Sequence, residues 1–155
     1  MKKIFVGVLA VGMLGFAFTT KPVNDKGEVK IENEETVDGI KFFQGTWEEA
    51  LEAAEEQNKL IFLDAYASWC GPCKIMAANT FTKKEVGDFF NKNFINFKMD
   101  MEKHAEGRRL SQKFHLTAYP SLYFLDGKEE VKHKVVGSQS VPGLIGHGKT
   151  ALTKK

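Results

Sequence analysis

The chain contains few cysteines: there are two among 155 residues, Cys70 and Cys73, and both lie in the stretch WCGPCK. So small a number excludes a disulfide-stapled scaffold, which needs several bridges, and a four-cysteine zinc site. The histidines are also few and lack the spacing of metal ligands, so we expect them to face solvent; they are His104, His115, His133 and His147. The sequence therefore predicts no metal site.

The chain has no marked surplus of one charge sign. Lys and Arg number 22 and Asp and Glu number 20, and the two counts become equal when Lys2 and Lys3 of the N-terminal segment are left out. A nucleic-acid-binding domain normally gathers a basic surplus on one face. The balance argues against nucleic acid as a partner.

No apolar run reaches the length of a membrane span. The longest one, residues 4–18, has 15 residues, short of the roughly 20 that cross a bilayer. It follows two lysines and ends at Ala17-Phe18-Thr19, an imperfect small-x-small cleavage site, as in a bacterial secretory signal. We expect residues 1–19 to be a signal peptide, with an uncleaved membrane anchor as the alternative, and residues 20–37 to be a polar flexible linker.

Such a signal places the mature protein in the periplasm or an equivalent exported compartment. These compartments are oxidising. A dithiol that works there in its reduced form needs a source of electrons.

Residues 38–155 show the alternating pattern of an α/β domain. Strands are expected at 40–43, 60–66, 94–100, 121–125 and 131–136, the last two flanking a turn at Asp126-Gly127. Helices are expected within 46–59, at 71–79, within 81–94, within 103–115 and, weakened by Pro142 and three glycines, in the tail. Thr46 with Glu49, and Thr82 with Glu85, are spaced as capping boxes. The order predicts a mixed sheet with helices on both faces.

Cys70 and Cys73 follow an apolar strand and open a predicted helix. A sulfur at a helix N-terminus faces free backbone N–H groups and the positive end of the helix dipole, which favours the reactive thiolate. Gly71 leaves the approach open, and Pro72 is tolerated in a first helical turn. We expect Cys70 to attack a partner disulfide and Cys73, the more buried of the two, to resolve the mixed disulfide.

Two other interpretations of the cysteine pair are weaker. A purely structural disulfide between residues three apart closes so short a loop that it removes little chain entropy. A zinc site needs four ligands, and the sequence has no second cysteine pair.

The run Trp69-Cys70-Gly71-Pro72-Cys73-Lys74 resembles the active-site motif of thioredoxins in full. In that family a buried acid lies six positions before the first cysteine, here Asp64, and a cis-proline followed by a hairpin and a glycine faces the dithiol. The stretch AYPSLYFLDGKEEVKHKVVG resembles that block, with Pro120 as the cis-proline and Gly137 as the glycine. The resemblance covers about residues 42–137. It implies an α/β thioredoxin fold, a central mixed β-sheet flanked by helices on both faces.

Within this superfamily the chain is similar to the C-terminal periplasmic domain of the thiol:disulfide interchange protein (DsbD) and to exported thioredoxin-like proteins. The apolar pattern after the motif matches at Phe81, Val86, Phe89 and Phe94. Tyr119, before the proline, is bulkier than the Ile, Thr or Val of better-known members, which leaves partner choice open. The electron-supplying membrane domain of the interchange protein is not in this sequence, so we expect a separate upstream membrane electron donor.

The resemblance also implies roles for residues around the dithiol. Asp64 is the expected proton acceptor for Cys73, against the alternative of an exposed acid at a strand end. Trp69 is expected to shield the dithiol and touch substrates, against the alternative of a plain core aromatic. The expected catalytic residues are Cys70, Cys73 and Asp64, and the expected substrate-binding residues are Trp69, Gly71, Pro72, Tyr119 and Pro120.

These residues predict an exported, monomeric thiol–disulfide oxidoreductase that reduces disulfides of partner proteins. It needs no cofactor beyond its own redox-active Cys70–Cys73 disulfide. Disulfide isomerisation and cytochrome c maturation use the same chemistry and stay open. The alternative of another class is a redox-inactive thioredoxin-like binding module.

Overall fold

The computed structural model describes residues 38–155. The expected signal peptide and linker, residues 1–37, lie outside the described residues. The elements in chain order are α1 (Trp47–Glu56), β1 (Leu60–Tyr66), α2 (Gly71–Asn79), α3 (Lys84–Asn93), β2 (Phe94–Asp100), α4 (Ala105–Lys113), β3 (Ser121–Leu125), β4 (Val131–Val136) and α5 (Val141–Leu152). Within this range no helix is both long enough and apolar enough to cross a membrane.

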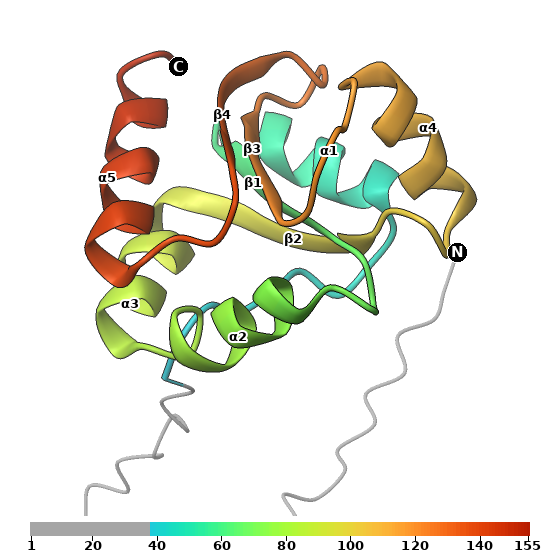
Figure 1. Ribbon diagram of the computed structural model, residues 1–155. Coiled ribbons are helices and arrows are strands. Elements are labelled where there is room, and N and C mark those ends of the chain that lie inside the picture. The colour runs from blue at the N-terminus through green and yellow to red at the C-terminus, as the bar shows by residue number, and fades with distance from the viewer. Residues whose placement is uncertain (1–37) are drawn as a thin grey trace, which may run out of the picture. The chain divides into compact units, whose positions relative to one another are not determined.

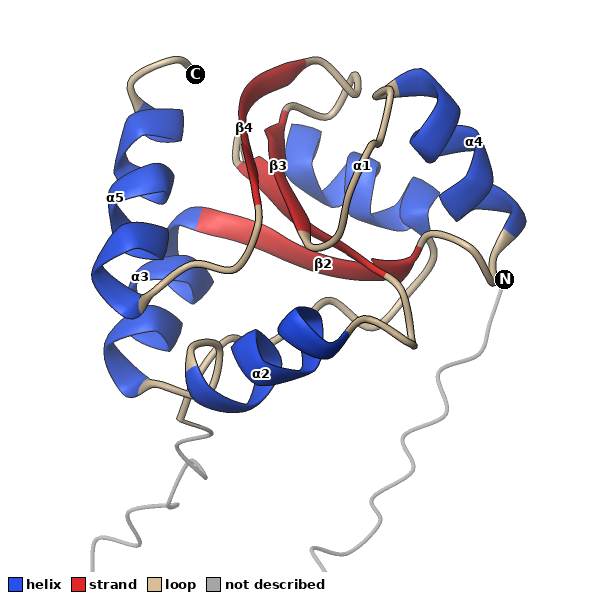
Figure 2. Ribbon diagram, in the orientation of Figure 1, coloured by secondary structure: helices blue, strands red, loops and turns tan. Residues whose placement is uncertain are grey.

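The strands form one mixed sheet in the order β2-β1-β3-β4. β1 pairs in parallel with β2 and antiparallel with β3, and β3 pairs antiparallel with β4. Helices α1 and α4 cover one face, and α2, α3 and α5 cover the other (Figures 1 and 2). This is the α/β architecture that the sequence predicts.

β1 is the buried centre of the sheet, as its apolar run, interrupted only by Asp64, predicts. Ile61 and Leu63 belong to the core on the α1 and α4 side, and Leu60 and Phe62 to the core on the opposite side. Successive side chains of a strand alternate between faces, so one strand feeds both cores. The Phe62 ring also lies 4.7 Å from the Phe90 ring of α3. The cysteine motif therefore starts from a strand packed on both sides.

Residues 40–43 do not form a strand, contrary to the prediction. The segment makes one backbone hydrogen bond to β2, from Phe43 N–H to the Asn96 carbonyl at 2.7 Å. Side-chain amides satisfy other groups: Asn91 Oδ1 accepts from Lys41 N–H at 2.8 Å, and Asn96 Nδ2 donates to the Lys41 carbonyl at 3.3 Å. The side chains of Asn91 and Asn96 thus satisfy backbone groups that a neighbouring strand would satisfy in a β-sheet.

α5 is a complete helix of 12 residues, where the sequence predicts a weak or ragged one. Pro142 lies in the first turn, where no helical hydrogen bond is lost, and the Ser140 hydroxyl accepts from Gly143 N–H. A Cβ at Gly148 would come within 2.6 Å of the Phe89 ring, so the missing side chain lets α5 pack closely on α3. Packing therefore outweighs the low helix propensity of the tail.

One of the two predicted capping boxes is present. Thr46 Oγ1 accepts from Glu49 N–H at 3.2 Å, and Glu49 Oε2 accepts from Thr46 N–H at 2.7 Å. At α3 the N-cap residue is Lys83, without a side-chain cap. The second prediction is wrong because the Thr82 hydroxyl donates to the Ala78 carbonyl of α2 instead.

Candidate active site

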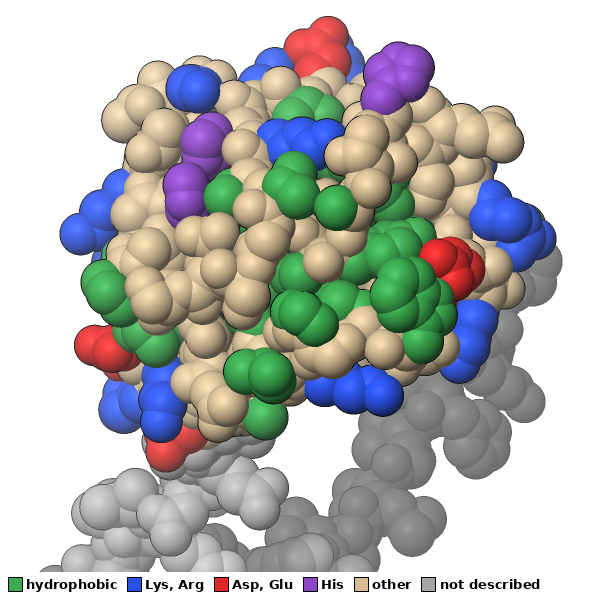
Figure 3. All heavy atoms as spheres, in the orientation of Figure 1, with side chains coloured by type: hydrophobic (Ala, Val, Ile, Leu, Met, Phe, Trp, Pro, Cys, Tyr) green, Lys and Arg blue, Asp and Glu red, His purple; other side chains and the backbone are tan. Residues whose placement is uncertain are grey.

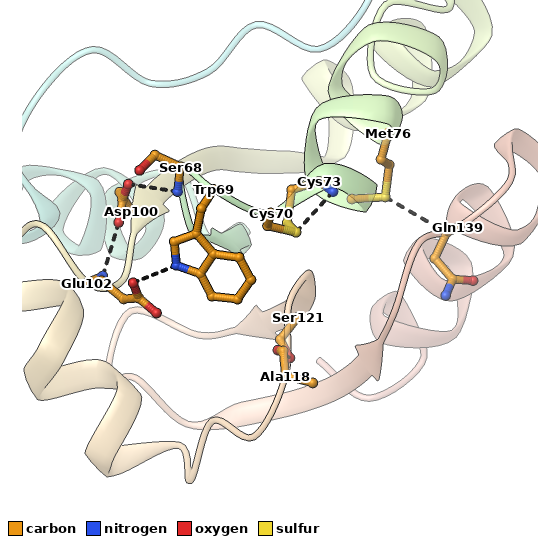
Figure 4. Close-up of a disulfide and its surroundings, with 10 residues drawn as sticks. All are labelled: Ser68, Trp69, Cys70, Cys73, Met76, Asp100, Glu102, Ala118, Ser121 and Gln139. Carbon is orange, nitrogen blue, oxygen red and sulfur yellow. Dashed lines mark hydrogen bonds between the residues drawn. A yellow bond between two sulfur atoms is a disulfide. The ribbon is translucent and has the colours of Figure 1, made fainter.

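Cys70 and Cys73 lie at the N-terminus of α2, directly after β1, and are joined by a disulfide (Figure 4). Cys70 is the N-cap residue, and its Sγ accepts a hydrogen bond from the Cys73 backbone N–H at 3.1 Å. Pro72 lies in the first turn, and Gly71 is exposed, with open space where a Cβ would be. In the reduced protein this N–H group and the helix dipole favour a thiolate at Cys70.

Both cysteines are buried, with exposed fractions of 2% for Cys70 and 6% for Cys73. The prediction that Cys73 is the more buried of the two is therefore wrong for the disulfide form. Tyr66 and Tyr119 pack against the cluster that contains the disulfide. Access to the Cys70 sulfur thus depends on how the aromatic side chains around it are arranged.

Asp64 is buried in β1, with an exposed fraction of 2%, which excludes the alternative of an exposed acid at a strand end. Its Oδ1 has no hydrogen-bond partner among residues 38–155. Burial raises its pKa from 3.8 to about 7, and the positive charge of Lys98, its register partner on β2, partly opposes this rise. A carboxyl with this pKa can accept or release a proton near neutral pH.

A pocket of about 220 Å³ lies between Asp64 and one cysteine of the pair, Cys73. Cys73 and Asp64 both line it, and Lys74 and Lys98 contribute its charged groups. A pocket of this size holds several water molecules, because one water needs about 30 Å³ of liquid volume. Asp64 and Cys73 therefore face one shared space that has room for water.

Trp69 stands at the surface beside the disulfide with an exposed fraction of 67%, which excludes a plain core aromatic. Its indole N–H donates to Glu102 Oε2 at 2.8 Å (Figure 4). Its ring meets the Tyr119 ring edge to face, with centroids 5.8 Å apart. The indole is thus oriented by two neighbours from other loops while its surface stays open to a partner.

Pro120 follows a cis peptide bond from Tyr119, as the sequence resemblance implies. Pro120 is buried, and its carbonyl accepts from Gly137 N–H at 2.8 Å, where Gly137 has a positive φ of 95°. Through Tyr119 the turn reaches the cysteine cluster and Trp69. The structure thus places Tyr119 and Pro120, directly before β3, at the same end of the sheet as the disulfide.

Comparison with known proteins shows to which family the chain belongs. A profile of thioredoxin-like proteins matches residues 42–127. The chain belongs to the thioredoxin-like family. It is 28% identical to the thiol:disulfide interchange protein DsbD of Pseudoalteromonas atlantica, over 96% of this chain and 25% of that protein. The chain thus spans about a quarter of the length of that relative.

Two solved structures resemble this thioredoxin-like chain. A disulphide-isomerase candidate from Bacteroides thetaiotaomicron is 40% identical, with a TM-score of 0.67 over 77% of this chain and 98% of that one. The oxidised C-terminal domain of Neisseria meningitidis DsbD shares the fold at 22% identity, with a TM-score of 0.58 over 72% of this chain and 99% of that domain. The predicted family and the thioredoxin fold are therefore confirmed. The protein is a thioredoxin-like disulfide oxidoreductase whose redox group is its own Cys70–Cys73 pair.

The site of this thioredoxin-like protein contains three polar residues that the sequence did not predict: Lys98, Asp100 and Glu102. Asp100 accepts backbone N–H bonds from Ser68, Glu102 and Lys103, each at 3.1 Å, and so joins the loop before Cys70 to the loop after β2 (Figure 4). Burial alone would raise its pKa, but these donors outweigh burial and lower it. The sequence did contain one signal for Asp100: it ends a predicted strand. The carboxyl ends of parallel strands such as β1 and β2 meet at one edge of a sheet.

Proposed function

We propose that this protein is an exported thiol–disulfide oxidoreductase that reduces disulfides in partner proteins. One observation carries the proposal: the Cys70 sulfur lies at the N-cap of α2, 3.1 Å from the Cys73 N–H, next to a pocket shared by Cys73 and Asp64. The direction of the reaction rests on the Gly-Pro pair of the motif, which resembles thioredoxin and its strongly reducing potential.

The proposed reaction starts from the dithiol. The Cys70 thiolate attacks one sulfur of the partner's disulfide, which breaks, and the other partner sulfur leaves as a thiolate and takes up a proton. The Asp64 carboxylate accepts the Cys73 proton through the shared pocket. The Cys73 thiolate then attacks Cys70 Sγ, and the partner's first sulfur leaves and is protonated. The partner gains two electrons, and the protein keeps the Cys70–Cys73 disulfide.

The proposed binding surface surrounds Cys70. Trp69 offers a flat apolar face, and the exposed Gly71 and Pro72 leave the backbone of the motif accessible. An extended partner segment would pair with the backbone of Tyr119, next to the cis-proline Pro120. Main-chain pairing suits substrates of varied sequence, because it does not read side chains.

We place this chemistry outside the cytoplasm, in a monomer that uses no nucleic acid and draws electrons from a membrane donor. The support is the signal-like stretch at residues 1–19, followed by the linker-like residues 20–37. Cell fractionation and N-terminal sequencing of the mature protein test this. A mature chain that starts near residue 20 supports cleavage, a full-length chain in the membrane fraction supports the anchor, and a cytoplasmic full-length chain refutes export.

Insulin reduction with dithiothreitol tests the activity. We expect turnover by the native protein, none by Cys70→Ser, and accumulation of a mixed disulfide by Cys73→Ser, because only the resolving sulfur is then missing. Ser111→Ala, on α4, serves as a matched control. Equal turnover by the native protein and Cys70→Ser would instead favour the redox-inactive binding module.

Disulfide isomerisation is the second candidate function. It is favoured by the 40% identity to the Bacteroides thetaiotaomicron disulphide-isomerase candidate, which is matched over 98% of its chain. Reactivation of scrambled ribonuclease without added reductant separates the two functions. The protein is added in its reduced form and in catalytic amount: an isomerase restores ribonuclease activity, whereas a reductase is oxidised after one turnover per chain and leaves most of the substrate scrambled and inactive.

A further inference from the structure

Helix α2 carries both cysteines, but few of its side chains anchor it in the protein. Only Cys73 and Met76 of its nine residues are buried. Within residues 38–155, no hydrogen bond joins α2 directly to the turn formed by Tyr119 and Pro120. The position of the dithiol relative to that turn therefore depends on a link through another segment.

Gln139, in the loop between β4 and α5, supplies this link. Its backbone N–H donates to Met76 Sδ at 3.4 Å (Figure 4). Its carbonyl accepts from the hydroxyl of Thr80, the C-cap residue of α2, at 3.1 Å. Met76 and Thr80 lie four positions apart, so both contacts are on one side of the helix. The sequence hid them because 63 and 59 residues separate Gln139 from its two partners.

Gln139 also reaches the turn on the other side of the site. Its Nε2 donates to the Gly137 carbonyl at 3.1 Å, and Gly137 N–H donates to the Pro120 carbonyl at 2.8 Å. Hydrogen bonds thus lead from α2 through Gln139 to the cis-proline. The space-filling view shows hydrophobic side chains gathered between α2 and the turn that leads into β3 (Figure 3). A partner that covers this surface meets both sides of the link at once.

We propose that Gln139 is a positioning residue for disulfide exchange, which fixes the spacing between the dithiol on α2 and the turn at Pro120. This inference rests on the proposed function, in which a partner segment pairs with the backbone of Tyr119 while its sulfur reaches Cys70. The segment makes both contacts only at one spacing, and a displacement of about 1 Å can slow a reaction about 100-fold. A small disulfide that touches Cys70 alone needs no such spacing.

The test removes the two bonds in Cys73→Ser, the variant in which the mixed disulfide accumulates. Met76→Leu removes the sulfur acceptor, and Thr80→Val removes the hydroxyl while keeping the shape of the side chain. With both changes we expect a mixed disulfide with an extended, cystine-linked peptide to form about 10-fold more slowly. The rate with dithiobis(nitrobenzoate), a small disulfide, should change by less than about 2-fold. Thr80→Ser keeps the hydroxyl and should leave both rates unchanged.

Two matched controls separate this role from a general loss of packing. Met101→Leu makes the same exchange in the core on the other face of the sheet, and Thr150→Val removes a hydroxyl that bonds within α5. Both should react with the two disulfides as Cys73→Ser does. Circular dichroism checks that each variant is folded. If the double change prevents folding, Met76→Leu and Thr80→Val alone should each slow the peptide reaction about 3-fold.

The inference is overturned if the peptide reaction keeps its rate when the two bonds are removed. It is also overturned if both disulfides react more slowly by the same factor, because the contacts of Gln139 would then act on the sulfur and not on the spacing. A different result refutes the proposed function itself, and the inference with it: that Cys73→Ser forms no mixed disulfide with the peptide.

Discussion

Asp64 and Asp100 are two carboxyl groups of low exposure at the same end of the sheet, and their pKa values are shifted in opposite directions. Their exposed fractions are 2% and 3%, and they lie on the paired strands β1 and β2, two register positions apart. Burial raises the pKa of Asp64 to about 7, whereas that of Asp100 is lowered although burial alone would raise it. Two features differ: Asp64 lies deeper in the protein, so burial acts on it more strongly, and Asp100 accepts three backbone N–H groups whereas Asp64 Oδ1 accepts none among residues 38–155.

Low exposure therefore does not by itself decide whether an acid serves structure or chemistry. A carboxylate that receives several backbone donors stays ionised and fixes the segments that supply them. A carboxylate without such donors becomes a weak acid that can exchange protons near neutral pH. In this protein the first kind, Asp100, holds the loop before Cys70, and the second, Asp64, shares a pocket with Cys73, from which the proposed reaction takes a proton.

The largest expected effect is on the pH dependence of stability. Because the pKa of Asp64 is higher in the folded than in the unfolded state, native stability falls as pH rises from about 4 to about 7. The total loss is up to about 4 kcal/mol. Asp64→Asn, which cannot ionise, should remove this loss and be more stable than the native protein at about pH 8. Urea unfolding at both ends of the window measures this, and equal pH dependence of the two proteins would show that Asp64 is not a raised-pKa acid.

The next largest effect is expected on stability when Asp100 is replaced. Asp100→Ala leaves the N–H groups of Ser68, Glu102 and Lys103 without their acceptor, so we expect a loss of about 2–4 kcal/mol in the free energy of unfolding. Asp100→Asn, which keeps one acceptor oxygen, should lose less. The stabilisation is present above the unfolded pKa and disappears as pH falls below it, since the folded pKa is lowered. A loss below about 0.5 kcal/mol for the alanine variant would contradict this assignment.

The third expected effect is on the rate at which the mixed disulfide is resolved. Asp64→Asn should slow resolution of the mixed disulfide about 100-fold at neutral pH, because Cys73 loses its proton acceptor. The rate of attack by Cys70 should change much less. Stopped-flow fluorescence of Trp69 can follow both steps, and the inflection near pH 7 in the resolution step should vanish in the variant. An unchanged resolution rate would leave Asp64 with no part in the reaction.

The smallest effect tests the support of Trp69. Glu102→Ala removes the acceptor of the indole N–H, which is bonded at 2.8 Å on an exposed side chain. We expect a stability loss of about 1 kcal/mol or less, with a modest rise in KM for insulin as the indole becomes free to turn. Glu102→Gln retains an acceptor and should behave like the native protein. A larger effect for the glutamine than for the alanine variant would mean that charge, rather than the hydrogen bond, matters.

Much of the fold was predictable because its signals are local. The β1 run, the start of α2 at Gly71 and the capping box of α1 each depend on neighbouring residues. The WCGPCK motif likewise led to the correct family. The failures came where distant contacts decide: amides of Asn91 and Asn96 hold residues 40–43 without a ladder, and close packing on α3 completes α5.

The sequence by itself determined the reactive pair, the family and the alternation of strands and helices, since these follow from motif spacing and from apolar periodicity. Only the tertiary structure decided that Asp64 and Asp100 differ in ionisation, that Cys70 is as well covered as Cys73, and that His133 meets His147. The physical reason is that pKa, burial and side-chain pairing depend on which atoms lie within a few ångströms. Residues far apart in the chain supply most of those atoms.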